Sequence, residues 1–301
     1  MGMLKALTYR NVKLFFKDKG MFFTAMITPL ILLVLYVTFL GNVYKDSFVQ
    51  GLPQGVPVPD KLINGLVGGQ LLSSLLAVCC VTVAFCSNLL VVQDKVSGAR
   101  DDIAMTPVKG SVLAASYFIS TAISTLLICF VATGVTFVYL AAVGWYLSVA
   151  DALLFIFDVF ILSMFGTALS SVISHFLSTQ GQMSAVGSII SSVYGFVCGA
   201  YMPISQFGKG LQNVIAMLPG TYGTSLLRKH AMNGAFRELS AIGIPDEGVE
   251  AMKDVVDANV YFFGKAVSTE IMYAIIIASV LILAFVYVIL NRKSKKTTER
   301  R

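Results

Sequence analysis

Few side chains in this sequence could do chemistry, and most of them stand alone among apolar residues. Asp158 lies inside the apolar run LLFIFDVFILSMFG, and the two histidines, His175 and His230, are far apart and have no acidic neighbours. A carboxylate inside such a run is costly unless it is paired, hydrated or protonated, so Asp158 is a candidate functional residue. The alternative is that Asp158 lies at the edge of the run, as nearby Asp151 indicates, and pairs with a basic residue of a polar lobe.

The motifs of common catalytic classes are missing from the sequence. It contains no GxxxxGK[ST] loop for nucleotide phosphates and no HExxH pair for zinc. The cysteines fall inside apolar segments and lack the paired spacing of a metal site, so we interpret them as buried packing residues. They are Cys79, Cys80, Cys86, Cys129 and Cys198. We therefore expect no catalytic residue, no metal site and no cofactor in this chain.

The elements that must position these side chains are long apolar helices. Of the 301 residues, 56% are hydrophobic and 13% are charged, and the mean hydropathy is +0.80. A bilayer core about 30 Å thick needs about 20 apolar residues in a helix. Six segments meet this requirement: about 22–44, 66–92, 112–141, 152–174, 183–201 and 270–291. The sequence thus predicts an all-α membrane protein whose residues 1–301 form a single transmembrane domain.

The distribution of basic residues predicts how these spans are oriented in the membrane. With six spans both ends of the chain lie on one side, and that side then holds most of the 22 Lys and Arg residues. Positive residues favour the cytoplasmic side, so both termini are expected there. The net charge of +6 is explained by lysines and arginines that face anionic lipid, without any nucleic-acid partner.

Three further segments flank or interrupt the spans. Residues 1–20 alternate apolar and basic side chains, which is typical of an interfacial amphipathic helix. Residues 203–269 are expected outside: an apolar stretch between Pro203 and Pro219 is too short to span and predicts a re-entrant segment. A polar lobe over residues 233–265 is expected to follow it.

Polar and small residues inside the spans indicate where a substrate could pass. The fifth span carries a run of small residues that includes Ser188 and Ser192, and the second span carries the polar Asn88. Small residues allow helices to approach closely, so the fifth span either packs tightly or lines a path. Asn88, Asp158, Ser188 and Ser192 are the candidate path residues.

The loop between the second and third spans, residues 93–111, is short and dense in charge. We expect a short helix from about Ser97 to Met105 that ends at Thr106-Pro107. Such a helix can stand out from the membrane as a rigid contact for another protein, whereas the plainer interpretation is a hydrophilic connector. The candidate contact residues are Asp94, Gly98, Arg100, Asp101, Ile103, Met105 and Pro107.

Two sequence patterns resemble the membrane subunits of ABC-2 type exporters. The loop has the order acid, Gly, short helix, Thr-Pro, and the second pattern runs from a small-residue helix through Tyr-x-Pro to Leu-Pro-x-x-Tyr. One departure is Asp94, where the family more often has Glu. The matching residues are Asp94, Gly98, Ile103, Thr106, Pro107 and Val108, and then Gly199, Tyr201, Pro203, Leu218, Pro219, Tyr222, Leu227 and Arg228.

The resemblance implies a permease of a bacterial plasma membrane, similar to those of multidrug and daunorubicin resistance. It implies two copies of a separate ABC ATPase that binds ATP and Mg, and a second copy of this chain. Residues 93–111 would then be the coupling loop, and Tyr201, Pro203, Pro219 and Tyr222 the extracellular gate.

We expect the two copies to meet through spans one, two and five, and the substrate to be amphipathic or hydrophobic, such as a drug, lipid or peptide. A stand-alone secondary transporter and a membrane-embedded enzyme are the alternatives.

Overall fold

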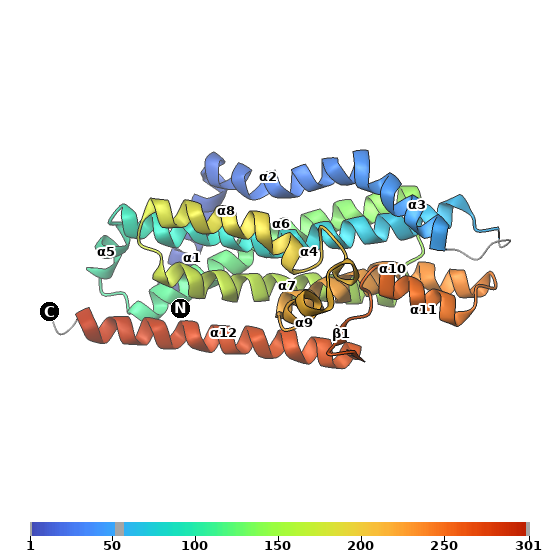
Figure 1. Cartoon of the computed structure of the whole chain (residues 1–301). Helices are drawn as coiled ribbons and strands as arrows, with labels where there is room; N and C mark the ends of the chain where they lie inside the picture. Colours follow the sequence, from blue (N-terminus) through green and yellow to red (C-terminus); the bar gives the residue numbers. More distant parts are fainter. Residues whose placement is uncertain (1, 52–56, 299–301) are drawn as a thin grey trace.

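The computed structural model describes residues 2–51 and 57–298, which form an elongated bundle of helices (Figure 1). One helix, α4 (Asp60–Val96), runs through the centre and is buried along almost its whole length. Its apolar residues are spread all round the helix, as a helix surrounded by other helices requires. The other long helices are α2 (Lys19–Leu35), α6 (Gly110–Val143), α7 (Val149–Phe176), α8 (Gln180–Val197), α10 (Pro219–Ala241) and α12 (Thr269–Thr298).

Close packing of α7 on α4 depends on one small residue. A Cβ atom built on Gly166 would lie 2.6 Å from the carbonyl oxygen of Cys80, so any larger residue would push the two helices apart. Small residues at such crossings let backbones approach in a membrane, where dispersion contacts stabilise helix pairs. The five cysteines are buried and unpaired, as predicted.

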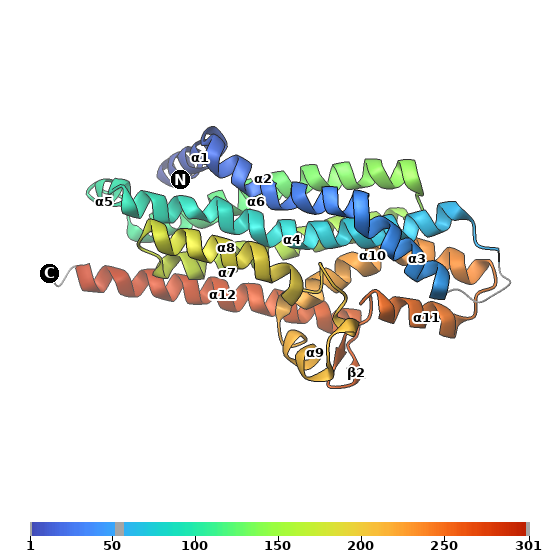
Figure 2. The ribbon, with the colours of Figure 1, turned by 45° about the horizontal axis from the view of Figure 1, so that its top comes forward.

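In the described residues, five helical segments are long and apolar enough to cross a membrane. They are Lys19–Asp46, Asp60–Val96, Gly110–Val143, Val149–Phe176 and Thr269–Arg292, and they correspond to predicted spans one, two, three, four and six. The predicted fifth span forms α8, which runs beside the others in Figures 1 and 2. Its serines and glutamines make it more polar than the rest.

The first span is longer than predicted. After α2 the chain forms one π-helical turn, Tyr36–Leu40, and continues into α3 (Gly41–Gly51). Helix therefore extends through residue 51, beyond the predicted span 22–44. The widened turn follows Pro29 by two turns of helix.

The predicted polar lobe over residues 233–265 is wrong in its first part. Helix α10 is buried and packs against α4, α7 and α12. Its buried Arg228 and His230 are accommodated because they pair with carboxylates inside the bundle, which hydropathy alone does not reveal. The exposed part is smaller: α11 (Asp246–Val255) and an antiparallel pair of strands, β1 (Tyr261–Phe262) and β2 (Lys265–Ala266), with Phe262 opposite Lys265.

Short elements close the two ends of the bundle. Both ends of the described chain lie at one end together with α1 (Gly2–Lys17) and α5 (Ala99–Ala104), whereas α3 and α11 lie at the other (Figures 1 and 2). Helix α1 packs mainly on α6 and turns Asn11 and Phe15 inward. Near α10, a 3-10 turn (Ile204–Gln206) precedes α9 (Lys209–Ile215).

Candidate functional site

The predicted short helix in the charged loop is present as α5. Gly98 reverses the chain out of α4 with a φ of +80°, a conformation that favours glycine. After α5, the Thr106 hydroxyl donates a hydrogen bond to the Ile103 carbonyl oxygen (2.6 Å) before Pro107 stops the helix. The loop is thus a rigid projection at the end of the bundle that holds both termini (Figure 1).

Ile103 and Met105, two apolar residues of this loop, face opposite ways. Met105 is 86% exposed and stands on the outer surface with Asp101 and Asp102. Ile103 is half-buried and packs on the small apolar cluster that includes Leu113 and Tyr117. Met105 is therefore free to solvent on the outer surface of the loop in this chain, whereas Ile103 fixes the loop to the bundle.

Asp94, predicted as a contact residue, lies inside the protein. Its carboxylate accepts two hydrogen bonds from the Arg10 guanidinium (2.7 and 3.2 Å) and one from the Tyr117 hydroxyl (2.6 Å). The carboxylate raises the pKa of Arg10 by stabilising its charged form. Asp94 thus ties α1 and α6 to the end of α4, and it is not available to an outside partner.

Removing this charge should loosen α1. Asp94→Asn keeps the shape of the side chain but loses the charge-assisted pair with Arg10, which is typically worth about 2 kcal/mol. We expect the backbone amides of α1 to exchange with deuterium faster than in the wild type, in a measurement by mass spectrometry. Lys5→Gln, on the exposed face of α1, is the control and should leave exchange unchanged. Equal protection of α1 in both variants would contradict the role of Asp94.

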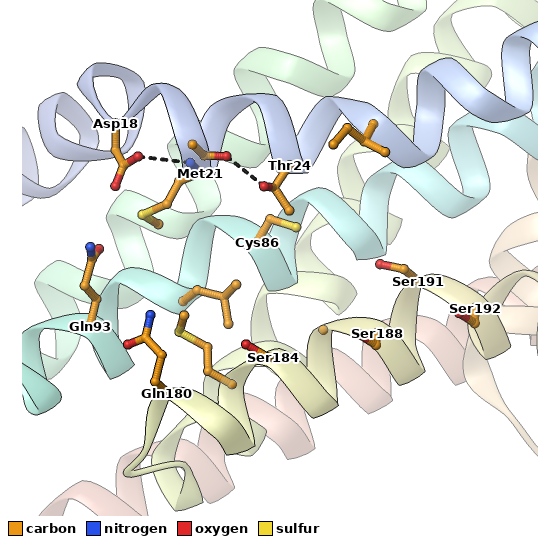
Figure 3. Close-up of a pocket in the computed structure, with 15 residues that line it drawn as sticks. Asp18, Met21, Thr24, Cys86, Gln93, Gln180, Ser184, Ser188, Ser191 and Ser192 are labelled. Atoms are coloured by element: carbon orange, nitrogen blue, oxygen red, sulfur yellow. Dashed lines mark hydrogen bonds between the residues drawn. The ribbon is translucent and has the colours of Figure 1, made fainter.

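A groove of about 660 Å³ lies between α2, α4 and α8. Figure 3 shows Ser184, Ser188, Ser191 and Ser192 of α8 along one wall and Asp18 and Thr24 near the opposite one. Ser188 and Ser192 are exposed, so these two predicted path residues lie where a substrate could reach them.

Asn88 has a different position. It is buried, donates hydrogen bonds to the Ser170 and Ser171 hydroxyls (3.3 and 3.4 Å) and accepts one from Thr121 (3.3 Å). This network joins α4 to α6 and α7, so Asn88 stabilises helix packing and does not line the groove. Ser73, on the same helix, is also fully buried, and the predicted contact between two copies through span two has no exposed surface in this region.

The four predicted gate residues shape the connection from α8 to α10. The Tyr201 hydroxyl donates to the Ser191 carbonyl (3.1 Å), and the Tyr222 hydroxyl donates to the Ala216 carbonyl (2.6 Å). Pro203 caps the 3-10 turn, and Pro219 is the first residue of α10. All four residues therefore set the turns of the predicted re-entrant segment. Helix α9 of this segment lies beside the middle of the bundle's long axis and not at the end opposite α5 (Figure 2).

A buried ion pair, missed by the sequence analysis, holds this connection in place. Arg228 of α10 is fully buried; it donates to the Asp257 carboxylate (3.1 Å), to the Ser74 hydroxyl of α4 (3.0 Å) and to the Gly199 carbonyl. Asp257 also accepts hydrogen bonds from the backbone N–H groups of Ile204 (2.5 Å) and Ser205 (3.2 Å).

Electrostatics explain why the two charges are found together. Burial raises the pKa of Asp257, and the Arg228 guanidinium and the two backbone N–H groups oppose that rise. The signal in the sequence was Arg228 itself, a cation six residues after Tyr222 of the Leu-Pro-x-x-Tyr pattern. Its partner lies 29 residues away in the segment after α11, a separation from which no pairing can be inferred.

Asp158 is buried within the fourth span and has two partners. His230 Nδ1 lies 2.5 Å from one carboxylate oxygen, and the Tyr273 hydroxyl donates to the other (2.6 Å). Asp158 does pair with a basic residue, as the alternative expected, but that residue is the buried His230 of α10 and does not belong to the lobe over residues 233–265. Asp151 takes the position at the edge of the span and pairs with Arg237 (2.5 Å).

Solutes have little access to this polar cluster. The side chain of Asp158 is 1% exposed and that of His230 is 7% exposed. Histidine, carboxylate and tyrosine satisfy one another's hydrogen-bonding groups, as polar groups between membrane helices must. The cluster thus connects α7, α10 and α12, and its geometry offers no room for a reacting molecule.

The sequence model described as "ABC-2 type transporter" matches residues 3–231. These residues include α1, α5, the groove helices and the first half of α10 with Arg228 and His230. No curated protein matches the sequence.

Proposed function

The chain belongs to the ABC-2 type transporter family, and we propose that two copies of it form the membrane part of an exporter driven by two copies of a separate ABC ATPase. The chain itself is the permease component. ATP and Mg bind to the partner, since the sequence has no phosphate-binding loop of its own. The exporter belongs to the plasma membrane of a bacterium, with both termini of the permease in the cytoplasm.

The observation that carries this proposal is the projecting helix α5. Its outer surface combines one exposed apolar residue, Met105, with two carboxylates, Asp101 and Asp102. An apolar anchor with a charged rim is the usual composition of a small protein contact. Because α5 is fixed to α4 and α6 through Ile103, a push on α5 is transmitted directly to two membrane helices.

The groove between α2 and α8 supports an export path. Its serine wall and its apolar wall, which includes Met21 and Ile27, suit an amphipathic or hydrophobic molecule such as a drug, lipid or peptide. One chain leaves this groove open on one side, so a second copy packed against α2 and α8 would enclose it. The connection from Tyr201 to Tyr222, held by Arg228, would then close the outer end as a gate.

The alternatives receive less support from the geometry. A membrane-embedded enzyme or a stand-alone secondary transporter needs polar groups that a substrate or ion can reach. Asp158 and His230 are converging ionisable groups inside the described bundle, and both are buried.

Co-purification and ATP hydrolysis test the proposal. The chain, produced with an ABC ATPase encoded in a neighbouring reading frame, should purify as a complex of two copies of each protein. In lipid vesicles, hydrolysis should rise when an exported compound is added. Transport by the chain alone, driven by an ion gradient and indifferent to ATP, would overturn the proposal in favour of a secondary transporter.

A further inference from the structure

A second groove, of about 590 Å³, lies between the beginning of α6 and the end of α12. The groove is open because several side chains that line it are small, chiefly those of Ala114, Ala115 and Ala284. Tyr287 closes its inner side, because its hydroxyl donates to the Ala114 carbonyl (3.2 Å) and its ring lies 5.9 Å from that of Phe118. The walls are therefore apolar and held in a fixed shape.

Two cations stand at the mouth of this groove. Lys109 and Arg292 both line it and are exposed, and its lining includes no carboxylate. Neither cation forms a salt bridge with a carboxylate in the part of the chain that the structure describes. Lys95 and Arg100 lie just behind, around a small hollow that shares Tyr287 with the groove. The groove thus has an unpaired positive mouth and an apolar interior.

The mouth lies where lipid headgroups would be. Lys109 directly precedes the span Gly110–Val143, and Arg292 ends the span Thr269–Arg292. The apolar walls, which include Phe118 and Val288, run from there into the membrane. The mouth also lies at the end of the bundle that carries α5 and the end of α12 (Figure 1).

We propose that this groove binds one anionic phospholipid, with its phosphate between Lys109 and Arg292 and an acyl chain along Phe118 and Val288. Basic pockets between membrane helices on the cytoplasmic side are known to bind anionic headgroups. A zwitterionic lipid would bring its own cation to the same mouth.

The bound lipid would act on the coupling loop. Lys109 belongs to this loop (residues 93–111) and lies two residues after Pro107, so a headgroup held by Lys109 and Arg292 would link the loop to α12. This inference does not depend on the proposed function, since lipid binding is measured on the chain alone.

Native mass spectrometry of the purified chain tests the site. Phosphatidylglycerol and phosphatidylcholine of the same acyl length are titrated in detergent, and glycerol 3-phosphate is titrated separately. We expect one phosphatidylglycerol per chain to be retained in preference to phosphatidylcholine, and no retention of glycerol 3-phosphate, because the acyl chain contributes to binding. Equal retention of the two lipids would overturn the proposal, and retention of glycerol 3-phosphate would show a phosphate site that does not need lipid.

Variants locate the bound lipid. The double variant Lys109→Gln with Arg292→Gln should weaken phosphatidylglycerol binding about 30-fold, because each basic residue near a headgroup contributes about a factor of five. Ala115→Phe, which fills the groove and leaves both charges, should also abolish retention. The control is Lys5→Gln with Lys17→Gln, which removes two exposed charges of α1 at the same end. A similar loss in the control, or unchanged binding in both groove variants, would overturn the proposal.

Discussion

Arg228→Met is expected to destabilise the protein by about 3–5 kcal/mol, the largest effect on stability that we predict. Breaking a buried ion pair from one side leaves the other charge uncompensated at low dielectric. Here Asp257 would lose its only described cationic partner, and the Ser74 hydroxyl and Gly199 carbonyl would lose a donor. Thermal unfolding in detergent, followed by the exposure of the buried cysteines to a thiol reagent, measures the loss.

A double variant separates the charge from the packing. Arg228→Met with Asp257→Asn removes both charges and should recover much of the lost stability, because no buried carboxylate is then left unpaired. Lys253→Met is the control: Lys253 forms an ion pair with Glu250 on the exposed helix α11, and such pairs contribute less than about 1 kcal/mol. The role of the buried pair would be refuted if Arg228→Met unfolded at the wild-type temperature.

Structural features that depend only on the residues of one continuous segment could be predicted from the sequence. Five of the predicted spans are long apolar helices, and Gly98 and Pro107 bracket the short helix α5 close to the predicted position. These features are local: a run of apolar residues is selected by the bilayer, and a glycine and a proline begin and end a short helix.

Features that depend on pairing between distant segments could not be predicted. Helix α10 appears polar because it carries Arg228, His230 and Arg237, and each of these pairs with a carboxylate from another part of the chain. Once paired, Arg228 and His230 are compatible with burial, whereas Arg237 stays half-exposed. The error about α10 also hid the partner of Asp158, because His230 lies in the segment 203–269, all of which was expected outside the membrane.

Asp94 and Asn88 are two further residues whose partners on distant segments could not be predicted from the sequence. Both are polar residues of α4, and both were predicted to face a partner or a substrate. The centre of the bundle is instead occupied by α4 itself, so its polar groups turn to neighbouring helices, Asp94 to Arg10 and Asn88 to Thr121. Hydropathy identifies α4 as a membrane helix but does not show that it is the central one.

Met105→Asp is expected to have the largest effect on function. If α5 contacts the ATPase, the 86% exposed Met105 is its apolar anchor, and truncating or charging such an anchor often costs about 2 kcal/mol or more. We expect the ATPase to bind at least about 30-fold more weakly, or to hydrolyse ATP without export, while the permease remains folded. Binding of the purified ATPase to the permease in lipid discs, together with export from vesicles, provides the measurement.

Two matched variants make this result specific. Val255→Asp introduces the same charge at an exposed apolar residue of α11, at the far end of the bundle, and should leave ATPase binding unchanged. Ile103→Asp places the charge beneath α5, against Leu113 and Tyr117, and should loosen the loop and lower the unfolding temperature as well. If Met105→Asp leaves coupling intact while Ile103→Asp abolishes it, α5 supports the fold of this end and the ATPase binds elsewhere.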